Sequence, residues 1–316
     1  MKKTLFVLLC FTLFISCKKD KITDTGEKIY FNGHPTATAG WQEIYSMNKD
    51  GSGQKQLTNF SSGGALRIIN REPALSYDST KIYFISDKDF PGGELFSMNI
   101  DGSDVTKVLS SNILGNECQD FFLYQKGQKI VYGKALQMYP NWNGEIWSMD
   151  INGSNKVKLT SFGPDAPSYY PCVNAANTTI IYTCTVTAST AEIYAMNMNG
   201  SNKRALTSGG PQVKYHPQFS PDGTKIVFEG HVAGNLEIFI MNADGTNLMQ
   251  LTHYGLTRPN YVYSREATFS KDNKSIYYTS DEFDKKTTQL YKMNLDGTGN
   301  TMLSSSETNK HNPCIK

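Results

Sequence analysis

The sequence predicts an all-β protein, a six-bladed β-propeller made of four-stranded antiparallel blades. The first observation is a repeat: residues 237–246, Glu-Ile-Phe-Ile-Met-Asn-Ala-Asp-Gly-Thr, have five other copies, and the six glycines lie 45 to 52 residues apart. A fixed period of this length indicates a repeat architecture. The second is composition, with 12% aromatic residues and no amphipathic helical run after the first 20 residues, which suits short strands and tight turns. The third is that the two ends of the chain supply complementary parts of one repeat.

Blade five shows the repeat unit most clearly. Residues 220–223, Ser-Pro-Asp-Gly, form a turn signal because proline fixes φ and glycine tolerates a positive φ. The turn leads from an inner strand to a second strand at 225–228. A third strand at 237–242 is followed by the hairpin signal Asp-Gly and a fourth strand at 247–252. Four antiparallel strands per period are the blade of a propeller.

The other copies place the remaining blades. The third strand and its turn recur at 43–52, 94–103, 145–154, 192–201 and 289–298. The second strand recurs at 28–31, 81–84, 129–132, 179–182 and 275–278. The first hairpin of blade three, at 121–129, matches the pattern least well.

The ends of the chain predict how the ring closes. The first copy begins at its second strand, with Lys28, and has no inner strand before it. The C-terminal residues 311–315, His-Asn-Pro-Cys-Ile, resemble the inner strand of blade five at 215–219, Tyr-His-Pro-Gln-Phe. We therefore expect the last strand to complete the first blade, which removes the open edges that unpaired strands present.

Two repeated features are predicted to be structural. One aromatic residue occupies the same third-strand position in every blade, as expected for packing between blades rather than for stacking on a ligand; these residues are Tyr45, Phe96, Trp147, Tyr194, Phe239 and Tyr291. The six Asx-Gly turns lack the spaced carboxylates and distant glutamate of a calcium loop. Hairpin turns are the better interpretation.

The N-terminus is predicted to be an export signal. A basic start, Met-Lys-Lys, precedes an apolar run at 4–15 that is too short to span a bilayer. Residues 13–17, Leu-Phe-Ile-Ser-Cys, resemble the lipobox of bacterial lipoproteins, which implies a signal peptide at 1–16 and lipidation of Cys17. Residues 17–26 are then a flexible tether and residues 27–316 the propeller. The alternative is an ordinary signal peptide with an incidental cysteine.

Four cysteines lie within the propeller: Cys118, Cys172, Cys184 and Cys314. They have no C-x-x-C spacing that would indicate zinc or redox chemistry. Cys172 and Cys184 fall on consecutive predicted strands and could approach each other, since an exported protein can form disulfides. Buried thiols are the expectation we favour for all four.

The repeat resembles the TolB-type propeller repeat. The resemblance is carried by residues 219–228, Phe-Ser-Pro-Asp-Gly-Thr-Lys-Ile-Val-Phe, together with 237–246 and Gln-Leu-Thr at 250–252, and it extends over 27–316. It implies a propeller in the cell envelope that binds partner proteins. TolB itself has an N-terminal domain of more than a hundred residues, where this chain has about ten, so an anchored TolB-like propeller is expected and the partner of TolB is not transferred.

Similar repeats occur in two groups of enzymes, the oligogalacturonate lyases and the prolyl-oligopeptidase-type peptidases. The peptidases need a hydrolase domain with a G-x-S-x-G elbow, which the sequence does not contain. A lyase-like site needs a dense histidine cluster, and the five histidines are spread over the chain. His34 and His231 are predicted in loops just after second strands, and His253 in a loop after a fourth strand.

The candidate site is a ring at the mouth of the central channel, where the inner strands begin. Alignment on the second strands places six residues at one equivalent position: Glu72, Asp120, Tyr170, His216, Glu266 and Asn312. The residues before them are Arg71, Gln119, Tyr169, Tyr215, Arg265 and His311. The ring suits a basic peptide segment or a sugar, and a divalent cation held by Glu72, Asp120, His216 and Glu266 is a further interpretation. The plainest alternative is a solvated rim in which Arg71 and Arg265 pair with the glutamates beside them.

These observations predict a non-enzymatic, lipid-anchored, monomeric propeller that binds an envelope protein or peptide, with no cofactor. It would lie at the outer membrane, on its periplasmic or surface face. The formal net charge of +2 without a Lys/Arg cluster gives no electrostatic surface for nucleic acid. A carbohydrate-binding or oligosaccharide-cleaving protein that uses the same ring is the alternative, and a scaffold without a small ligand is a third interpretation.

Overall fold

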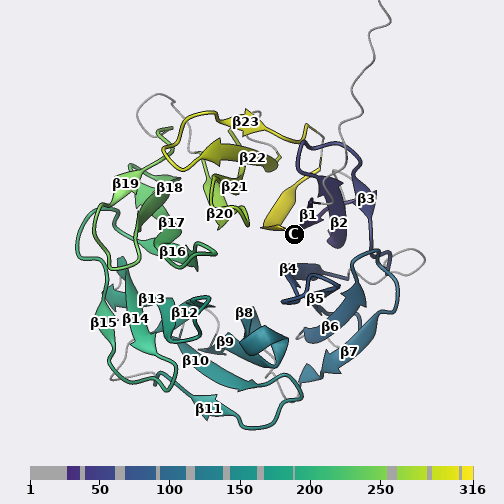
Figure 1. The fold of residues 1–316 in the computed structure, drawn as a ribbon, viewed down its shortest axis with the longest axis horizontal. Coiled ribbons are helices and arrows are strands. Elements are labelled where there is room, and N and C mark those ends of the chain that lie inside the picture. Colours follow the sequence, from purple (N-terminus) through teal and green to yellow (C-terminus); the bar gives the residue numbers. More distant parts are fainter. Residues whose placement is uncertain are drawn as a thin grey trace, which may run out of the picture.

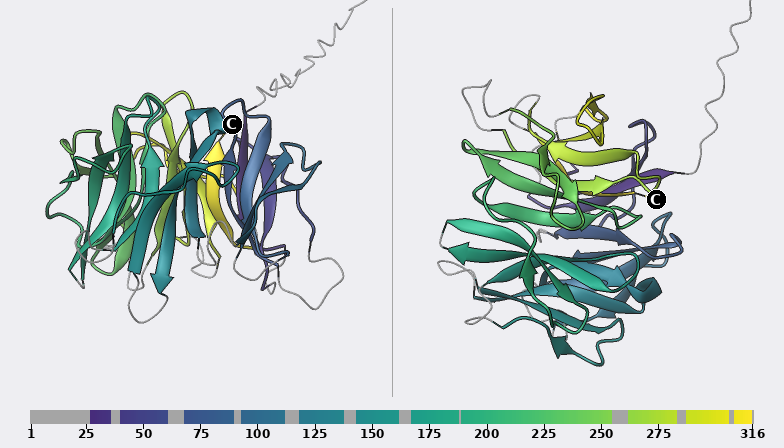
Figure 2. Two further views of the ribbon diagram at one scale, coloured as in Figure 1. Left: turned by 90° about the horizontal axis from the view of Figure 1, so that it is seen from below. Right: turned by 60° about the vertical axis from the view of Figure 1, so that its left-hand side comes forward.

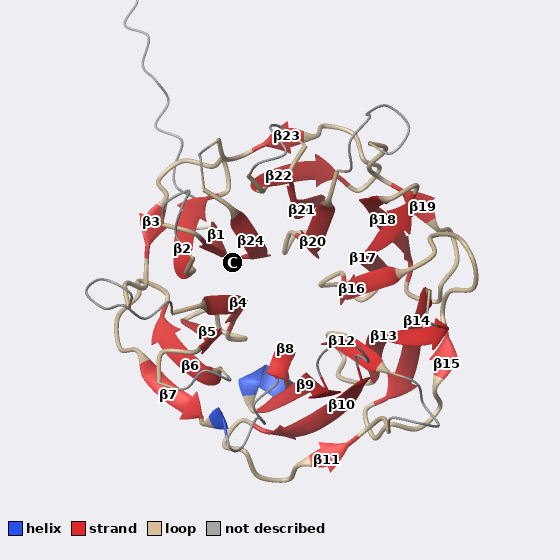
Figure 3. Ribbon diagram, turned by 180° about the vertical axis from the view of Figure 1, so that it is seen from behind, coloured by secondary structure: helices blue, strands red, loops and turns tan. Residues whose placement is uncertain are grey.

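The protein is a ring of six four-stranded antiparallel sheets around a central axis, and we call the region along this axis the channel (Figure 1). A computed structural model describes residues 27–35, 40–60, 68–89, 93–111, 118–137, 143–161, 167–187, 189–254, 262–282, 287–305 and 308–315. The predicted signal peptide, Cys17 and the tether therefore lie outside the described residues. The all-β, six-bladed prediction is confirmed (Figure 3).

Each blade runs from an inner strand to an outer one. From the channel outward, blades one to three are β24 (Lys310–Ile315), β1 (Lys28–Gly33), β2 (Glu43–Asn48), β3 (Lys55–Gln56); β4 (Asn70–Leu75), β5 (Lys81–Ser86), β6 (Glu94–Asn99), β7 (Thr106–Leu109); and β8 (Cys118–Tyr124), β9 (Lys129–Gln137), β10 (Asn143–Asp150), β11 (Val157–Lys158). Blades four to six are β12 (Ser168–Val173), β13 (Thr179–Thr187), β14 (Thr190–Asn197), β15 (Arg204–Ala205); β16 (Lys214–Phe219), β17 (Lys225–Val232), β18 (Asn235–Asn242), β19 (Met249–Gln250); and β20 (Ser264–Phe269), β21 (Ser275–Ser280), β22 (Gln289–Asn294), β23 (Thr301–Met302).

The ring closes as the chain ends predicted. The last strand, β24, pairs antiparallel with β1, and the register places Tyr30 opposite Cys314 and Asn32 opposite His311. Blade one is thus built from both ends of the chain. Closure of this kind leaves no open edge between the first and last blades.

Two kinds of element differ in detail from the sequence predictions. The outer strands are shorter than expected: β19 covers only Met249–Gln250 of the predicted 247–252. In blade three the Ser-Pro-Asp-Gly turn is replaced by a short 3-10 turn, Gln125–Gly127, in which Gln125 and Lys126 both have positive φ. This replacement explains why the first hairpin of blade three matched the repeat poorly.

A buried polar link accounts for the glutamate and threonine of the repeat. In blade five, Thr252 Oγ1 accepts a hydrogen bond from the backbone N–H of Ile238 at 2.9 Å and donates one to Glu237 Oε2 at 2.5 Å. Blade one repeats the arrangement with Thr58 and Glu43. The link fastens the outer strand to the start of the third strand in place of a longer ladder, and it satisfies polar groups that would be costly to bury alone.

The repeated aromatic residues pack as predicted. Phe239 lies directly opposite Phe228 of the second strand, and Tyr291 lies opposite Tyr278. The ring centroids of these two pairs are 5.6 Å and 5.4 Å apart. Such cross-strand pairs stabilise a sheet and fill the space between blades.

The Asx-Gly segments form hairpin turns, as predicted. Asp244 Oδ1 accepts hydrogen bonds from the N–H and the hydroxyl of Thr246 at 2.9 Å and 2.7 Å. Gly245 has a φ of +92°, and a Cβ placed on it would lie 2.2 Å from the carbonyl oxygen of Leu206 in the preceding blade. Glycine is needed here both for the turn and for the close approach of two blades.

The cysteine side chains that the structure describes are those of Cys172, Cys184 and Cys314, and none of the three forms a disulfide, as expected. The side chain of Cys118 lies outside the described part. Burial raises the pKa of the Cys172 and Cys314 thiols to about 12, which keeps them protonated.

Within the described ranges, no helix is long and apolar enough to cross a membrane.

Candidate functional site: the channel ring

The inner strands position the candidate site. They surround the channel, and β24 runs toward the face where the C-terminus lies, so the inner strands begin at the opposite face (Figures 1 and 2). The six predicted ring residues lie near the beginnings of these strands. We call them the channel ring: Glu72, Asp120, Tyr170, His216, Glu266 and Asn312.

Five of the six ring residues have an unusual backbone. Their φ angles are 53° at Glu72, 54° at Tyr170, 47° at His216, 58° at Glu266 and 50° at Asn312. Each lies at a bulge where the pairing of the inner strand with the second strand shifts register. A positive φ in a residue other than glycine costs of order 1 kcal/mol or more, and it persists only where the surrounding structure holds it, as functional sites can.

The bulges turn backbone N–H groups toward carboxylates of the preceding blade. The N–H of Asn312 donates to Glu266 Oε2 at 2.8 Å, and the N–H of Glu266 donates to Glu229 Oε1. The N–H of Tyr170 likewise bonds to the carboxylate of Asp120. The ring therefore contains hydrogen bonds that run from blade to blade, and these bonds offset the backbone strain.

His216 is the cationic member of the ring. Its Nδ1 lies 2.8 Å from Glu229 Oε1, and its ring centroid is 3.8 Å from that of Tyr170. Burial alone would lower the pKa of His216, but the charge and hydrogen bond of Glu229 and the charge of Glu72 raise it to about 9. About 36% of its side chain remains exposed, against 2% for Glu229. A charged imidazolium is therefore partly accessible while its partner is covered.

Glu266 is held as an ionised carboxylate. Thr279 Oγ1 donates to its Oε2 at 2.9 Å, and His311 Nδ1 lies 3.4 Å from its Oε1. Burial would raise the pKa of Glu266, but His311 and the N–H of Asn312 outweigh burial and hold this pKa at about 2. This carboxylate is charged at every physiological pH.

The carboxyl groups of Glu72 and Asp120, in contrast, have raised pKa values. Burial, with only partial compensation from His216, raises the pKa of Glu72 to about 7. Burial and the charge of Glu72 raise the pKa of Asp120 to about 7 as well. Asn312 Nδ2 donates to Glu72 Oε1 at 3.0 Å. Two carboxyl groups of the channel are thus poised to lose their protons when a positive charge arrives.

Tyr170 and the two arginines complete the predicted set. Burial and the charges of Asp120 and Glu229 raise the pKa of Tyr170, so its phenol stays neutral. The guanidinium of Arg265 lies over the ring of Tyr263, 5.2 Å from its centroid, and its charge also lowers the pKa of Glu266. The charge of Arg71 acts in the same direction on Glu72.

Sequence reasoning missed a second layer behind the ring, at the fifth residue of the second strand in blades one, five and six. Glu229 holds His216 there, Thr279 holds Glu266, and Asn32 accepts a hydrogen bond from Asn312 at 3.1 Å. In blade three this position is Gly133, where a Cβ would lie 2.4 Å from Asp120 Oδ1. A charged Glu229 directly after the apolar run 226–228 of the second strand was the available signal.

Two histidines outside the ring, His34 and His231, pack against residues that flank it. His34 follows β1 as predicted, but His231 lies within β17, which is longer than the repeat suggested. His34 packs edge-on against His311 with centroids 6.3 Å apart, and His231 packs edge-on against Tyr215 at 6.0 Å. In the described residues, no group of three or more His, Cys, Asp or Glu side chains is arranged to hold a metal ion.

Comparison with known proteins agrees with this architecture. Residues 210–316 match the TolB beta propeller domain family. No characterised protein sequence gave a significant match over the chain.

Solved structures share the fold over most of the chain. TolB from Acinetobacter baumannii superimposes with a TM-score of 0.72 at 18% identity, covering 92% of this chain and 67% of that one. A chain of a nidogen/laminin complex gives 0.65 at 13% identity, covering 92% and 98%. An oligogalacturonate lyase in complex with manganese gives 0.52 at 14% identity, covering 87% and 72%.

The fold and the family match define a six-bladed β-propeller. More particularly, its residues 210–316 match the TolB beta propeller domain, and its fold is similar to that of TolB, as the repeat predicted. At these identities the structural likeness establishes the fold alone, and function has to be argued from the site.

Proposed function

We propose that this chain is a non-enzymatic, lipid-anchored propeller of the cell envelope that binds a positively charged protein or peptide segment at the channel ring. The observation that carries the proposal is the convergence of Glu72, Asp120 and Glu266 on one channel, with Glu229 behind them. These side chains come from separate blades and meet there although they are distant in sequence. Such a gathering of acids favours a cationic ligand.

The protonation states add to this argument. Glu266 is already charged, while Glu72 and Asp120, each with a pKa of about 7, are half protonated near neutrality. A lysine or arginine side chain in the channel would lower both pKa values and complete the ionisation. The energy of ligand binding would thus offset the burial of these charges.

A peptide binding assay tests the proposal. The full-length protein in detergent is screened against short peptides, and we expect enrichment of lysine and arginine with an affinity that falls as salt increases. Glu72→Gln and Glu266→Gln should each weaken the best peptide by roughly tenfold or more. Tyr77→Ala is the matched control, because Tyr77 is 70% exposed on a turn outside the channel. No preference for basic peptides, or equal affinity in the ring variants, would refute the proposal.

The membrane anchor is proposed from the lipobox resemblance. Several acyl chains on Cys17 would hold the propeller stably at the membrane, since each buried methylene contributes about 0.8 kcal/mol. Labelled fatty acid should enter the wild-type protein and not Cys17→Ala. Equal labelling of both would exclude this anchor.

A carbohydrate ligand is the second candidate because one side of the ring is aromatic. Tyr170 lies 6.2 Å from Tyr215 and 3.8 Å from His216, measured between ring centroids. Aromatic faces beside carboxylates can stack on sugar rings as well as on peptides. Release of unsaturated products from acidic oligosaccharides, lost in His216→Ala, would favour this candidate over the peptide.

A further inference from the structure

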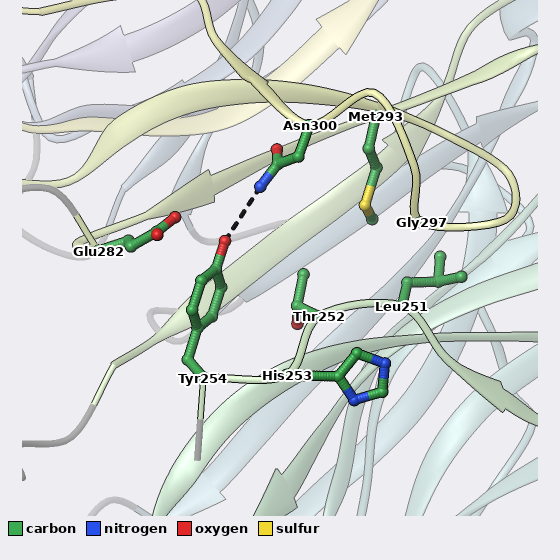
Figure 4. A pocket seen from close by; sticks show the side chains of 8 residues that line it. All are labelled: Leu251, Thr252, His253, Tyr254, Glu282, Met293, Gly297 and Asn300. Carbon is green, nitrogen blue, oxygen red and sulfur yellow. Dashed lines mark hydrogen bonds between the residues drawn. The ribbon is translucent and has the colours of Figure 1, made fainter. Parts of the chain in front are cut away.

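A cleft of about 310 Å³ lies away from the channel, between the end of blade five and blade six (Figure 4). Its lining includes Leu251, Tyr254, Glu282, Met293 and Asn300. Asn300 Nδ2 donates to Tyr254 Oη at 3.0 Å, and Asn300 Oδ1 accepts from Tyr278 Oη at 2.8 Å. The hydroxyl of Tyr254 also hydrogen bonds to the carboxylate of Glu282. An aromatic ring and a carboxylate are therefore held side by side.

The repeat provides an internal comparison for Glu282. In blade six, the N–H of Glu282 donates to Ser280 Oγ at 3.2 Å. In blade two, the N–H of Lys88 donates to Ser86 Oγ at the same distance. Glu282 and Lys88 therefore occupy equivalent positions with opposite charges.

Tyr254 has an equivalent residue in the same way. Tyr254 comes two residues after Thr252, and Phe60 comes two residues after Thr58. Both threonines accept a hydrogen bond from a third-strand N–H at 2.9 Å. Phe60 and Tyr254 thus occupy equivalent positions, each at the end of one blade and beside the next.

In blade two, ammonium groups of the chain itself occupy this place. Lys88 Nζ lies 5.5 Å from the ring centroid of Phe60 and 5.3 Å from that of Phe96. Lys107, opposite Phe96 on the outer strand, places its Nζ 5.8 Å from the same ring. These are distances at which a cation is attracted to an aromatic face.

In blade six, both lysines are replaced. Glu282 takes the position of Lys88, and Met302, opposite Tyr291 on the outer strand, takes that of Lys107. Tyr254 keeps the aromatic ring of Phe60 and adds a hydroxyl. The cleft therefore retains the aromatic part of a cation site and has gained a carboxylate in place of the two ammonium groups.

We propose that the Tyr254–Glu282 cleft binds an organic ammonium group supplied from outside the chain. The ammonium would contact the carboxylate of Glu282 and the ring of Tyr254, as Lys88 contacts the rings of blade two. The volume of the cleft suits a small amine or one lysine side chain of a partner protein. This site is separate from the channel ring and does not depend on the function proposed for it.

Choline and its neutral isostere 3,3-dimethylbutanol provide the sharpest test. Titration calorimetry on the full-length protein in detergent should show binding of choline and none, or at least tenfold weaker binding, of the alcohol. Glu282→Gln should weaken choline at least tenfold. Glu282→Lys should abolish choline binding, because it removes the carboxylate and places an ammonium group at the position that Lys88 occupies in blade two.

Further measurements distinguish a partner's lysine from a small amine as the ligand, and the cleft from the channel ring as the site. Nα-acetyl-lysine amide binding more tightly than choline would point to a partner's lysine, and the reverse order to a small amine; either order supports the site. Glu72→Gln, in the channel, should leave choline binding unchanged. Equal binding of choline and the alcohol, no binding of either amine, or wild-type affinity in Glu282→Lys would overturn the proposal.

Discussion

His216 combines a strained backbone with an ion pair inside the channel. Its φ of 47° is unfavourable for a residue with a Cβ, but its Nδ1 lies 2.8 Å from Glu229 and its ring packs near that of Tyr170. The equivalent residues Glu266 and Asn312 have the same backbone conformation. Their N–H groups donate hydrogen bonds to carboxylates of the preceding blade. At this scale, the residues that line the proposed ligand site are the same residues that join the blades.

The pKa values of the ring predict how stability depends on pH. Glu72 and Asp120, with pKa values raised to about 7, and His216, with a pKa raised to about 9, all bind more protons in the folded state than in the unfolded state. Their contribution to stability is therefore present at low pH and lost as pH rises through these values. We expect the melting temperature to fall by several degrees between about pH 5 and pH 8.

Glu72→Gln is the variant that checks this pH dependence. Glutamine carries no charge, so the variant should lose part of the decline and be more stable than the wild type at pH 8. Glu27→Gln, at a surface ion pair with Lys49, serves as a control that keeps the wild-type slope. A melting temperature that rises with pH in the wild type would contradict the assigned pKa directions.

The sequence could predict where the ring residues lie, because the repeat aligns one residue of each inner strand. The chemistry behind that position could not be predicted. Glu229, Thr279 and Asn32 lie on second strands, and their role depends on the bulge that brings ring residues against them. The positive φ of Glu72 or Tyr170 cannot be recognised from the residue type, whereas a glycine in a turn indicates its own positive φ.

Turns are the elements on which the packing of one blade against the next depends. Gly245 approaches the carbonyl of Leu206, and Gly297 approaches that of Leu251, each in the preceding blade. The turn glycine thus sets the spacing between blades as well as the direction of the chain. The sequence predicted the turns but not these contacts, because a repeat reveals equivalence and not what a residue touches.

Gly245→Ala and Gly223→Ala form a matched pair. Both glycines have positive φ, +92° and +71°, but a Cβ on Gly223 would meet nothing within 4 Å. We expect Gly223→Ala to cost about 1 kcal/mol of stability from backbone strain alone, and Gly245→Ala roughly 3 kcal/mol because Leu206 must also move. Denaturant unfolding measures both, and equal costs would contradict the blade-spacing role.

The whole molecule depends on the joining of its two ends. Blade one takes β24 from the C-terminus and β1 to β3 from the N-terminal half, so the ring cannot close until the last residues are in place. The sequence predicted this closure correctly, because the missing inner strand and the surplus one carry the same pattern. It could not predict that Asn312, on that strand, also bonds Glu72 of the next blade.

Deletion of residues 310–316 tests the closure. The shortened chain leaves β1 without its inner neighbour and removes the ring member Asn312, and we expect the melting temperature to fall by at least about 10 °C. Removal of Lys316 alone, which follows the end of β24, should change little. An unchanged melt after the longer deletion would show that closure does not stabilise the ring.

The central claim, that the channel ring binds a positively charged segment, is tested most directly by proton release on binding. Calorimetric titration of a basic peptide at pH 7, in buffers of different ionisation enthalpy, should show release of about one proton as Glu72 and Asp120 complete their ionisation. The release should disappear in the double variant Glu72→Gln/Asp120→Asn. Binding without proton release, or the same release in the double variant, would contradict the claim.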